Sequence, residues 1–169
     1  MSLRSFNMEY TASKRYEIND STIYIKVKPL THRWIKGFET AKEAIIYSPN
    51  KCMGHFMGAA LFCGNRLLAT GNNFTGKSQP GNTVKKEDGT EYTISCHAEQ
   101  NTLCAIKHYD YTNSKLIMYV ARVNNVGKFV NSRPCKMCID SLRKHGIKLV
   151  RFINKDGIPE ELYNFKLSI

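Results

Sequence analysis

Two short clusters in this chain contain the residue types of a catalytic metal site. The first is His97-Ala98-Glu99, and the second is Pro134-Cys135-Lys136-Met137-Cys138. Each cluster alone is ordinary, because a His-x-Glu triplet arises by chance and a Cys-x-x-Cys pair also occurs in redox sites and in parts of other metal sites. The two clusters together, in this order and each at an expected helix start, are a far more specific sign of a catalytic metal site.

The spacing of these residues favours zinc. Cys135 and Cys138 are three residues apart, so on a helix they share one face. His97 begins the other expected helix, and the positive ends of two helices favour the thiolates that bind metal. One imidazole and two thiolates leave the fourth position of a tetrahedral zinc ion open to water, as in catalytic sites. We therefore predict Zn2+ as the cofactor, with His97, Cys135 and Cys138 as its ligands.

Glu99 is the expected catalytic residue. It follows His97 too closely to be a comfortable fourth ligand, but it can reach a water molecule on the metal. Zinc lowers the pKa of such a water to roughly 7. A carboxylate beside it can take the proton and later release it, which is general acid and base catalysis by one group.

The two motifs resemble the cytidine and deoxycytidylate deaminase superfamily, whose zinc enzymes carry H-x-E and P-C-x-x-C. The resemblance covers roughly residues 37 to 154. It implies an α/β fold of three layers, α/β/α, in which helices cover both faces of a mixed sheet. It also implies a hydrolase that converts a cytosine base to uracil in a nucleoside or nucleotide. Zinc-bound hydroxide would attack C4, with Glu99 as the proton shuttle.

The resemblance also suggests substrate-binding residues. The segment from Gly58 to Asn73 is similar to the family's first hairpin, where an Asn at the end of the second strand contacts the substrate sugar. Asn73 is the best match and Asn72 the next. Ala98 matches the residue that offers a backbone N–H near the reacting water. Arg133, next to the expected ligands, is a candidate for contact with a substrate phosphate by position alone.

Composition is consistent with a single globular domain inside the cell. The chain has 169 residues, of which 42% are hydrophobic, and six cysteines. There is no apolar run long enough to cross a membrane and no apolar segment near Met1, so we expect a cytoplasmic protein without a membrane partner. In that setting a close cysteine pair indicates a metal more often than a disulfide.

Hydrophobic periodicity predicts the elements that position these motifs. Residues 22–28 alternate as a strand, and Trp34, Phe38, Ala41 and Ile45 recur as one helix face. The remaining predictions are a hairpin turning at Gly64-Asn65, a polar loop over 71–95, a helix over 96–108, a strand over 116–122, a helix that begins after Pro134 and ends near Gly146, and a strand over 147–154. The last twelve residues form either an antiparallel strand or a short helix.

We expect two parts along the chain. Residues 1–36 form an N-terminal extension, which is a loosely ordered arm with a short helix or none over 1–20 followed by the strand 22–28. Residues 37–169 form the deaminase domain. A terminal hairpin would resemble the branch of the superfamily that acts on free nucleosides. Members that act on deoxycytidylate or nucleic acids usually continue with a further helix and a parallel strand.

The charge pattern leaves the substrate open. The net charge is +11, and the segment from Lys115 to Arg151 holds nine Lys or Arg but one acid, Asp140. A basic surface suits a phosphorylated substrate or a polynucleotide, and it equally suits simple solvation. The alternatives are therefore a deaminase of cytosine or adenosine in single-stranded DNA or RNA, or a non-catalytic zinc module that binds nucleic acid. Glu99 argues against the second. The family resemblance also suggests a homo-oligomer.

Overall fold

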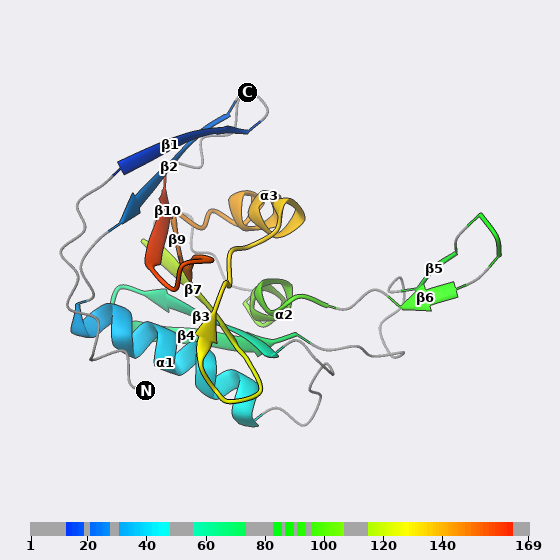
Figure 1. Ribbon diagram of the computed structural model, residues 1–169, viewed down its shortest axis with the longest axis horizontal. Coiled ribbons are helices and arrows are strands. Elements are labelled where there is room, and N and C mark those ends of the chain that lie inside the picture. The colour runs from blue at the N-terminus through cyan, green and yellow to red at the C-terminus, as the bar shows by residue number, and fades with distance from the viewer. Residues whose placement is uncertain are drawn as a thin grey trace.

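A mixed β-sheet forms the centre of the fold (Figure 1). The computed structural model describes residues 13–18, 21–27, 31–47, 56–73, 83–85, 87–89, 91–93, 96–106 and 115–163. Within these residues the main sheet has eight strands in the order β1-β2-β10-β9-β7-β3-β4, with β8 paired to β7. The strands are β1 Ser13–Ile18, β2 Ser21–Val27, β3 Phe56–Cys63, β4 Arg66–Asn72, β7 Leu116–Val123, β8 Phe129–Val130, β9 Leu149–Ile153 and β10 Pro159–Tyr163.

The pair β7 and β9 is parallel, and its register runs from Ile117↔Leu149 to Tyr119↔Arg151. The other pairs described in the main sheet are antiparallel. The sheet is therefore mixed, as predicted.

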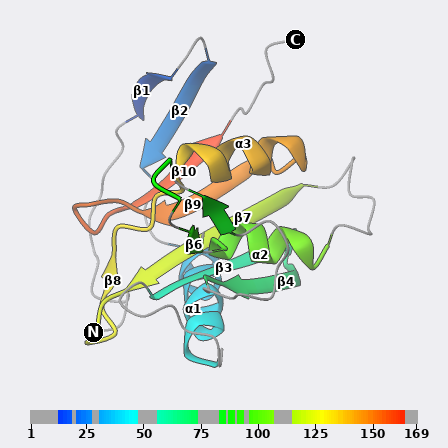
Figure 2. The same cartoon turned by 90° about the vertical axis from the view of Figure 1, so that its right-hand side faces the viewer.

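Helices cover both faces of this sheet. Helix α1, His32–Tyr47, lies on one face, and helices α2, Ala98–Cys104, and α3, Lys136–Lys144, lie on the other (Figures 1 and 2). Strand β7 divides its side chains between the two layers, because successive residues of a strand point to opposite faces. Its Met118 packs in the core under α2 and α3, whereas Tyr119 packs under α1. The predicted three-layer α/β/α fold is confirmed.

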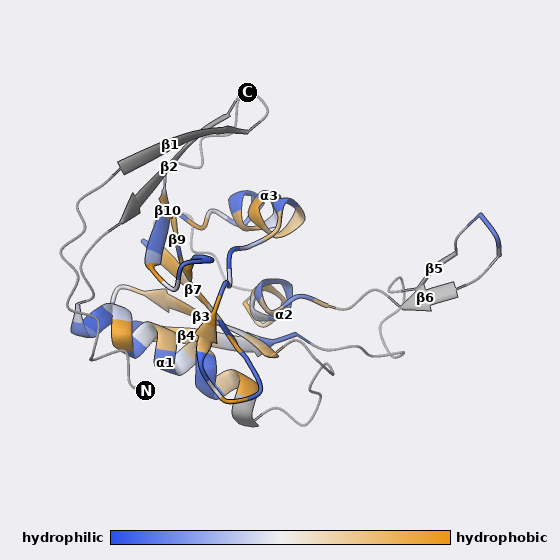
Figure 3. Ribbon diagram, in the orientation of Figure 1, coloured by the Kyte–Doolittle hydropathy of each residue, from blue (hydrophilic) through white to orange (hydrophobic). Residues whose placement is uncertain are grey.

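The helix predicted from Trp34, Phe38, Ala41 and Ile45 is also confirmed, since all four side chains are buried. Strands β7 and β9 are coloured mainly as hydrophobic, whereas α1 and α3 contain both hydrophilic and hydrophobic residues (Figure 3). Helix α1 lies very close to the sheet. A Cβ on Gly58 of β3 would come within 2.0 Å of the Ala41 carbonyl oxygen. Only glycine permits this approach.

Turns define the ends of two hairpins. The turn at Gly64-Asn65 joins β3 to β4 as predicted, and Gly64 has the positive φ of +59° that such turns require. The C-terminal alternative is settled in favour of a strand, because β10 pairs antiparallel with β9. Proline suits the start of a helix, but here Pro159 is the first residue of strand β10, a position where its missing backbone N–H is tolerated.

Two expectations for the polar segments are wrong in part. Residues 13–18 were expected to lack a strand, yet they form β1, which pairs along β2. Local alternation is weak there, so pairing with a neighbouring strand decides the structure. The expected loop over 71–95 contains β5 Thr83–Lys85 and β6 Glu91–Thr93, which form a separate two-stranded ribbon. Residues 1–12 lie outside the described part of the chain.

The predicted strand over 22–28 corresponds to β2, which joins the same sheet as the rest by pairing with β10. The division of the chain at residue 36 stays a proposal. In the part of the chain that the structure describes, we find no helix with the length and apolar character needed to span a membrane.

Candidate metal centre and active site

The starts of α2 and α3 bring together three side chains from distant parts of the chain. His97 is the N-cap residue of α2, and Cys135 is the N-cap residue of α3. The Nδ1 atom of His97 lies 3.2 Å from the sulfur of Cys138 and 3.5 Å from that of Cys135. All three donor atoms lie within 4.8 Å of one another. Helix α3 begins after Pro134 as predicted, although Pro134 itself lies just before the N-cap residue and not in the first turn.

The donor set fits a zinc ion. Zinc–nitrogen bonds of about 2.0 Å and zinc–sulfur bonds of about 2.3 Å at tetrahedral angles separate nitrogen and sulfur by about 3.5 Å. The measured separations of 3.2 and 3.5 Å are close to that value. Cys138 is buried, His97 is half-buried and Cys135 is exposed. The cluster therefore has one side toward solvent, where a small molecule can approach.

Glu99 is buried beside this cluster without a hydrogen-bond partner. It is 1% exposed, and neither carboxylate oxygen has a partner among the described residues. Burial is the main influence on the Glu99 carboxyl and raises its pKa. Buried polar groups in folded proteins are nearly always hydrogen-bonded. A buried carboxyl without a hydrogen-bond partner in the described part of the chain therefore lies next to three side chains that could hold a metal ion.

The thiols near the site share this low-polarity environment. Burial, followed by the nearby charges of Glu99 and Cys135, raises the pKa of Cys138. Burial is also the main cause of the raised pKa of Cys96. A thiol of this kind ionises when a metal ion replaces its proton, so metal binding at the cluster releases protons.

The end of β4 is fastened to α2 by an asparagine pair. The side-chain nitrogen of Asn101 donates to the backbone carbonyl of Asn72 at 3.1 Å and lies 3.5 Å from its side-chain oxygen. Gly71 permits this closeness, since a Cβ there would lie 2.6 Å from the backbone nitrogen of Thr102. The segment after β4 is thereby held next to the helix that begins at His97.

Asn73 follows β4 and is buried. Its side-chain oxygen accepts a hydrogen bond from the N–H of Met57 at 2.9 Å, and its own N–H donates to the Met57 carbonyl at 3.1 Å. The structure thus places Asn72 against α2, where it holds β4 to that helix, and bonds Asn73 to Met57 of β3.

The two other predicted substrate residues differ in exposure. Ala98, the first residue of α2, is completely buried between His97 and Glu99. Arg133 is exposed and lies two residues before Cys135, where its backbone N–H donates to the Asn131 side chain at 3.3 Å.

Several polar side chains in or near α2 and α3 were missed by sequence reasoning. Ser141 of α3 donates to the side-chain oxygen of Gln100 of α2 at 3.2 Å. Thr102 donates to the Ala98 carbonyl at 2.8 Å and lies 3.5 Å from the Ala59 carbonyl oxygen. Ser132 is buried in the segment that leads into α3. These polar residues carry no periodic signal and lie outside the two clusters, although Gln100 and Ser132 are within two residues of them.

Only some of the basic side chains between Lys115 and Arg151 are exposed on the surface. Arg151 is buried, and it pairs with Glu161 at 2.8 Å. Arg143 lies 3.5 Å from Asp140. The exposed basic residues of the segment are Lys115, Lys128, Arg133, Lys136, Lys144 and Lys148.

Comparison with known proteins identifies the group to which this arrangement belongs. The family described as the cytidine and deoxycytidylate deaminase zinc-binding region matches residues 33–154. A cytidine deaminase from Burkholderia pseudomallei is 20% identical, with 79% of this chain and 93% of that chain covered and a TM-score of 0.53. This likeness supports the fold. No match was found among curated protein sequences.

Two further solved structures resemble the chain. A deoxycytidylate deaminase from the cyanophage S-TIM5, in complex with dCMP and dUMP, is 25% identical, with 67% of this chain and 74% of that chain covered and a TM-score of 0.45. A cytidine deaminase from Mycobacterium leprae is 23% identical, with 74% and 90% covered and a TM-score of 0.47. Because the family match extends over most of the chain and includes both metal-binding clusters, the chain belongs to the cytidine and deoxycytidylate deaminase family.

Proposed function

We propose that this protein is a zinc-dependent hydrolytic deaminase that converts a cytosine base to uracil in a nucleoside or nucleotide. The observation that carries this proposal is the buried, unpaired carboxyl of Glu99 next to His97, Cys135 and Cys138. A structural zinc site does not need such a carboxyl, and its fourth coordination position is usually occupied by a protein ligand.

The proposed chemistry assigns one role to each group. Bound zinc supplies a Lewis acid that makes water acidic near neutral pH. Glu99 accepts the proton of the attacking water and passes it to the ring nitrogen, and then serves the leaving amine in the same way. The base gains oxygen at C4 and releases ammonia. Because burial raises the pKa of Glu99, its carboxyl can hold and release a proton closer to neutral pH.

Substrate contacts are proposed on the α2 side of the sheet. Asn73 is our candidate for the sugar, with Asn72 as the second candidate, because both lie at the end of β4, next to α2. The backbone of Ala98, between His97 and Glu99, is the candidate contact for the reacting water or the base. Arg133 is the candidate for a phosphate, since it is exposed and close in sequence to Cys135.

The strand order favours a small substrate. β10 runs antiparallel to β9, and this hairpin resembles that of the free-nucleoside branch of the superfamily. Exposed Arg133 and Lys136 beside the site favour a phosphate on that substrate. A second candidate is cytosine or adenosine in single-stranded DNA or RNA, and the exposed basic residues between Lys115 and Lys148 support it.

The test is ammonia release from cytidine, deoxycytidine, deoxycytidylate and a cytosine-containing single-stranded oligonucleotide. Glu99→Ala is the control for contaminating deaminases, and metal analysis establishes that each sample holds zinc. We expect release from at least one monomeric substrate and none from the variant. Release from the oligonucleotide alone would support the second candidate. Inactivity of the zinc-loaded protein on all four substrates would contradict the proposal.

A further inference from the structure

Ser132, in the segment between β8 and α3, bonds to two strands through its hydroxyl and its backbone N–H. It is 1% exposed. Its hydroxyl donates to the Val120 carbonyl of β7 at 2.7 Å and accepts from the Ile153 N–H of β9 at 2.9 Å. Its own N–H donates to the Ile153 carbonyl at 2.8 Å. A buried side chain with this many good hydrogen bonds is held in one place.

The position of Ser132 in the sheet explains these bonds. β7 and β9 pair in parallel as far as Tyr119 and Arg151. Val120 and Ile153 lie just beyond, where Ser132 bonds to each of them. The segment therefore leaves the sheet where two parallel strands separate at their carboxyl ends, which is where open α/β sheets bind their ligands.

Cys135 depends on this anchor more than Cys138 does. Cys135 is an exposed N-cap residue whose side chain makes no capping hydrogen bond. Only Arg133 and Pro134 separate it from Ser132, and proline restricts the backbone between them. Cys138, by contrast, lies on the buried face of α3 with Ile139 and Leu142, so core packing places it.

We propose that the Ser132 hydroxyl is a positioning residue for the metal centre, and that it acts by fixing the backbone that leads to Cys135. This inference rests on the metal centre of the proposed function. Groups that orient metal ligands typically contribute 10- to 100-fold to metal affinity. Ser132 contributes at the exposed cysteine, together with the buried Pro134 that directly precedes it.

The test measures metal binding independently of activity. Zinc affinity is obtained by competition with a chelating dye, and the geometry at the cysteines is followed by the absorption spectrum of the cobalt(II) protein. We expect Ser132→Ala to weaken zinc binding about 10- to 100-fold and to change the cobalt spectrum. Ser132→Thr, which keeps the hydroxyl, should restore both toward wild type.

Tyr119→Phe is the matched control, because it also removes a buried hydroxyl but on the α1 face of the sheet. It should lower thermal stability without altering zinc affinity or the cobalt spectrum. If Ser132→Ala folds poorly, the same titrations are made in buffer with sucrose, which favours the compact state.

Two results would overturn the role of Ser132 alone. They are an unchanged zinc affinity and cobalt spectrum in Ser132→Ala, or an equal loss of affinity in Tyr119→Phe, which would indicate a general effect on the fold. Failure of the wild-type protein to bind zinc or cobalt would instead overturn the metal centre, and this inference with it.

Discussion

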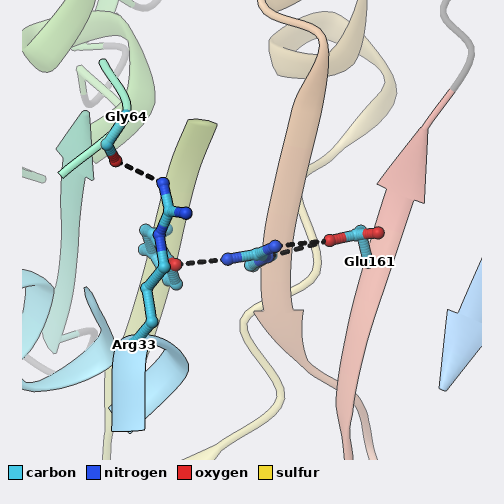
Figure 4. A network of polar contacts seen from close by, with 5 residues as sticks. Arg33, Gly64 and Glu161 are labelled. Atoms are coloured by element: carbon cyan, nitrogen blue, oxygen red, sulfur yellow. Dashed lines mark hydrogen bonds and ion pairs between the residues drawn. The ribbon is translucent and has the colours of Figure 1, made fainter. Parts of the chain in front are cut away.

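On one face of the sheet a buried charged pair is fully hydrogen-bonded, whereas on the other face a buried carboxyl has no hydrogen-bond partner among the described residues. Under α1, the Arg151 guanidinium bonds to Glu161 at 2.8 and 2.9 Å, donates to the Tyr119 hydroxyl and lies 4.4 Å from the ring centre of Trp34. Figure 4 shows this network, with the Glu161 carboxylate at one end. Under α2 and α3, the Glu99 carboxyl is equally buried but has no hydrogen-bond partner among the described residues.

This difference distinguishes a charge that serves the fold from one available for chemistry. A buried charge is costly unless it is paired and hydrogen-bonded. Arg151 and Glu161 meet this condition and join β9 to β10 at directly opposed positions. Glu99 does not, so burial raises its pKa. The unsatisfied group lies next to the metal-binding cluster, which is where a substrate would complete its hydrogen bonds.

The largest expected effect is the loss of a metal ligand. His97→Ala and Cys135→Ser should each lower zinc affinity by more than about 100-fold, because even groups that only support ligands contribute 10- to 100-fold. Cys138→Ser should also destabilise the fold more than Cys135→Ser, since Cys138 is buried and Cys135 is exposed. Metal analysis and thermal unfolding check both points. Full zinc occupancy in the first two variants would contradict the ligand assignment.

Replacing the unpaired carboxyl should separate catalysis from metal binding. We expect Glu99→Gln to keep zinc and to lose about 10²- to 10⁴-fold in kcat, the usual contribution of general acid and base catalysis. The measurement is the rate of ammonia release at equal zinc content. If the variant were as active as the wild type, Glu99 would have no role in the mechanism, and the unpaired carboxyl would no longer distinguish the two faces in function.

Breaking the paired charge should damage the fold but spare the metal centre. Glu161→Gln leaves the buried Arg151 guanidinium without its carboxylate, so we expect a loss of about 3–5 kcal/mol in the free energy of unfolding. The double variant Arg151→Met with Glu161→Leu removes both charges and should recover most of that loss. Urea unfolding measures the stability and dye competition measures zinc affinity. A drop in zinc affinity of folded Glu161→Gln would show that the faces are coupled.

The smallest expected effect is a gain in stability of the metal-free protein. The pKa of Glu99 is raised above its ordinary value of 4.5, so its ionisation destabilises the folded state. Stability is therefore fully present below that pH and declines as pH rises through the folded pKa. Glu99→Gln lacks this decline, and its Tm should exceed that of the wild type at neutral pH by about 2–4 °C for each kcal/mol removed.

The control for this pH prediction is internal. The Tm difference between Glu99→Gln and the wild type should shrink as pH falls below 4.5, where the wild-type carboxyl is protonated in both states. Scanning calorimetry of the metal-free proteins across this range measures it. A difference that stays constant with pH would mean that packing, and not ionisation, distinguishes the two.

Sequence alone determined the elements with strong periodicity and the spacing of the motifs. The stripe of Trp34, Phe38, Ala41 and Ile45 predicted α1, because burial of one helix face imposes a period near 3.6. The sequence allowed His97, Cys135 and Cys138 to be predicted as ligands of one metal ion, because these residue types occur in two short motifs at expected helix starts. Their grouping as neighbours in space comes from the structure.

Only the tertiary structure decided the remaining features. β1 and the direction of β10 depend on which strands lie beside them, and the local sequence carries little information about that. The hydrogen-bonding states of Glu99 and Glu161 are likewise invisible in the sequence, because the partners of a buried carboxyl depend on the fold. Their difference, like the anchoring by Ser132, arises from partners that folding brings from distant parts of the chain.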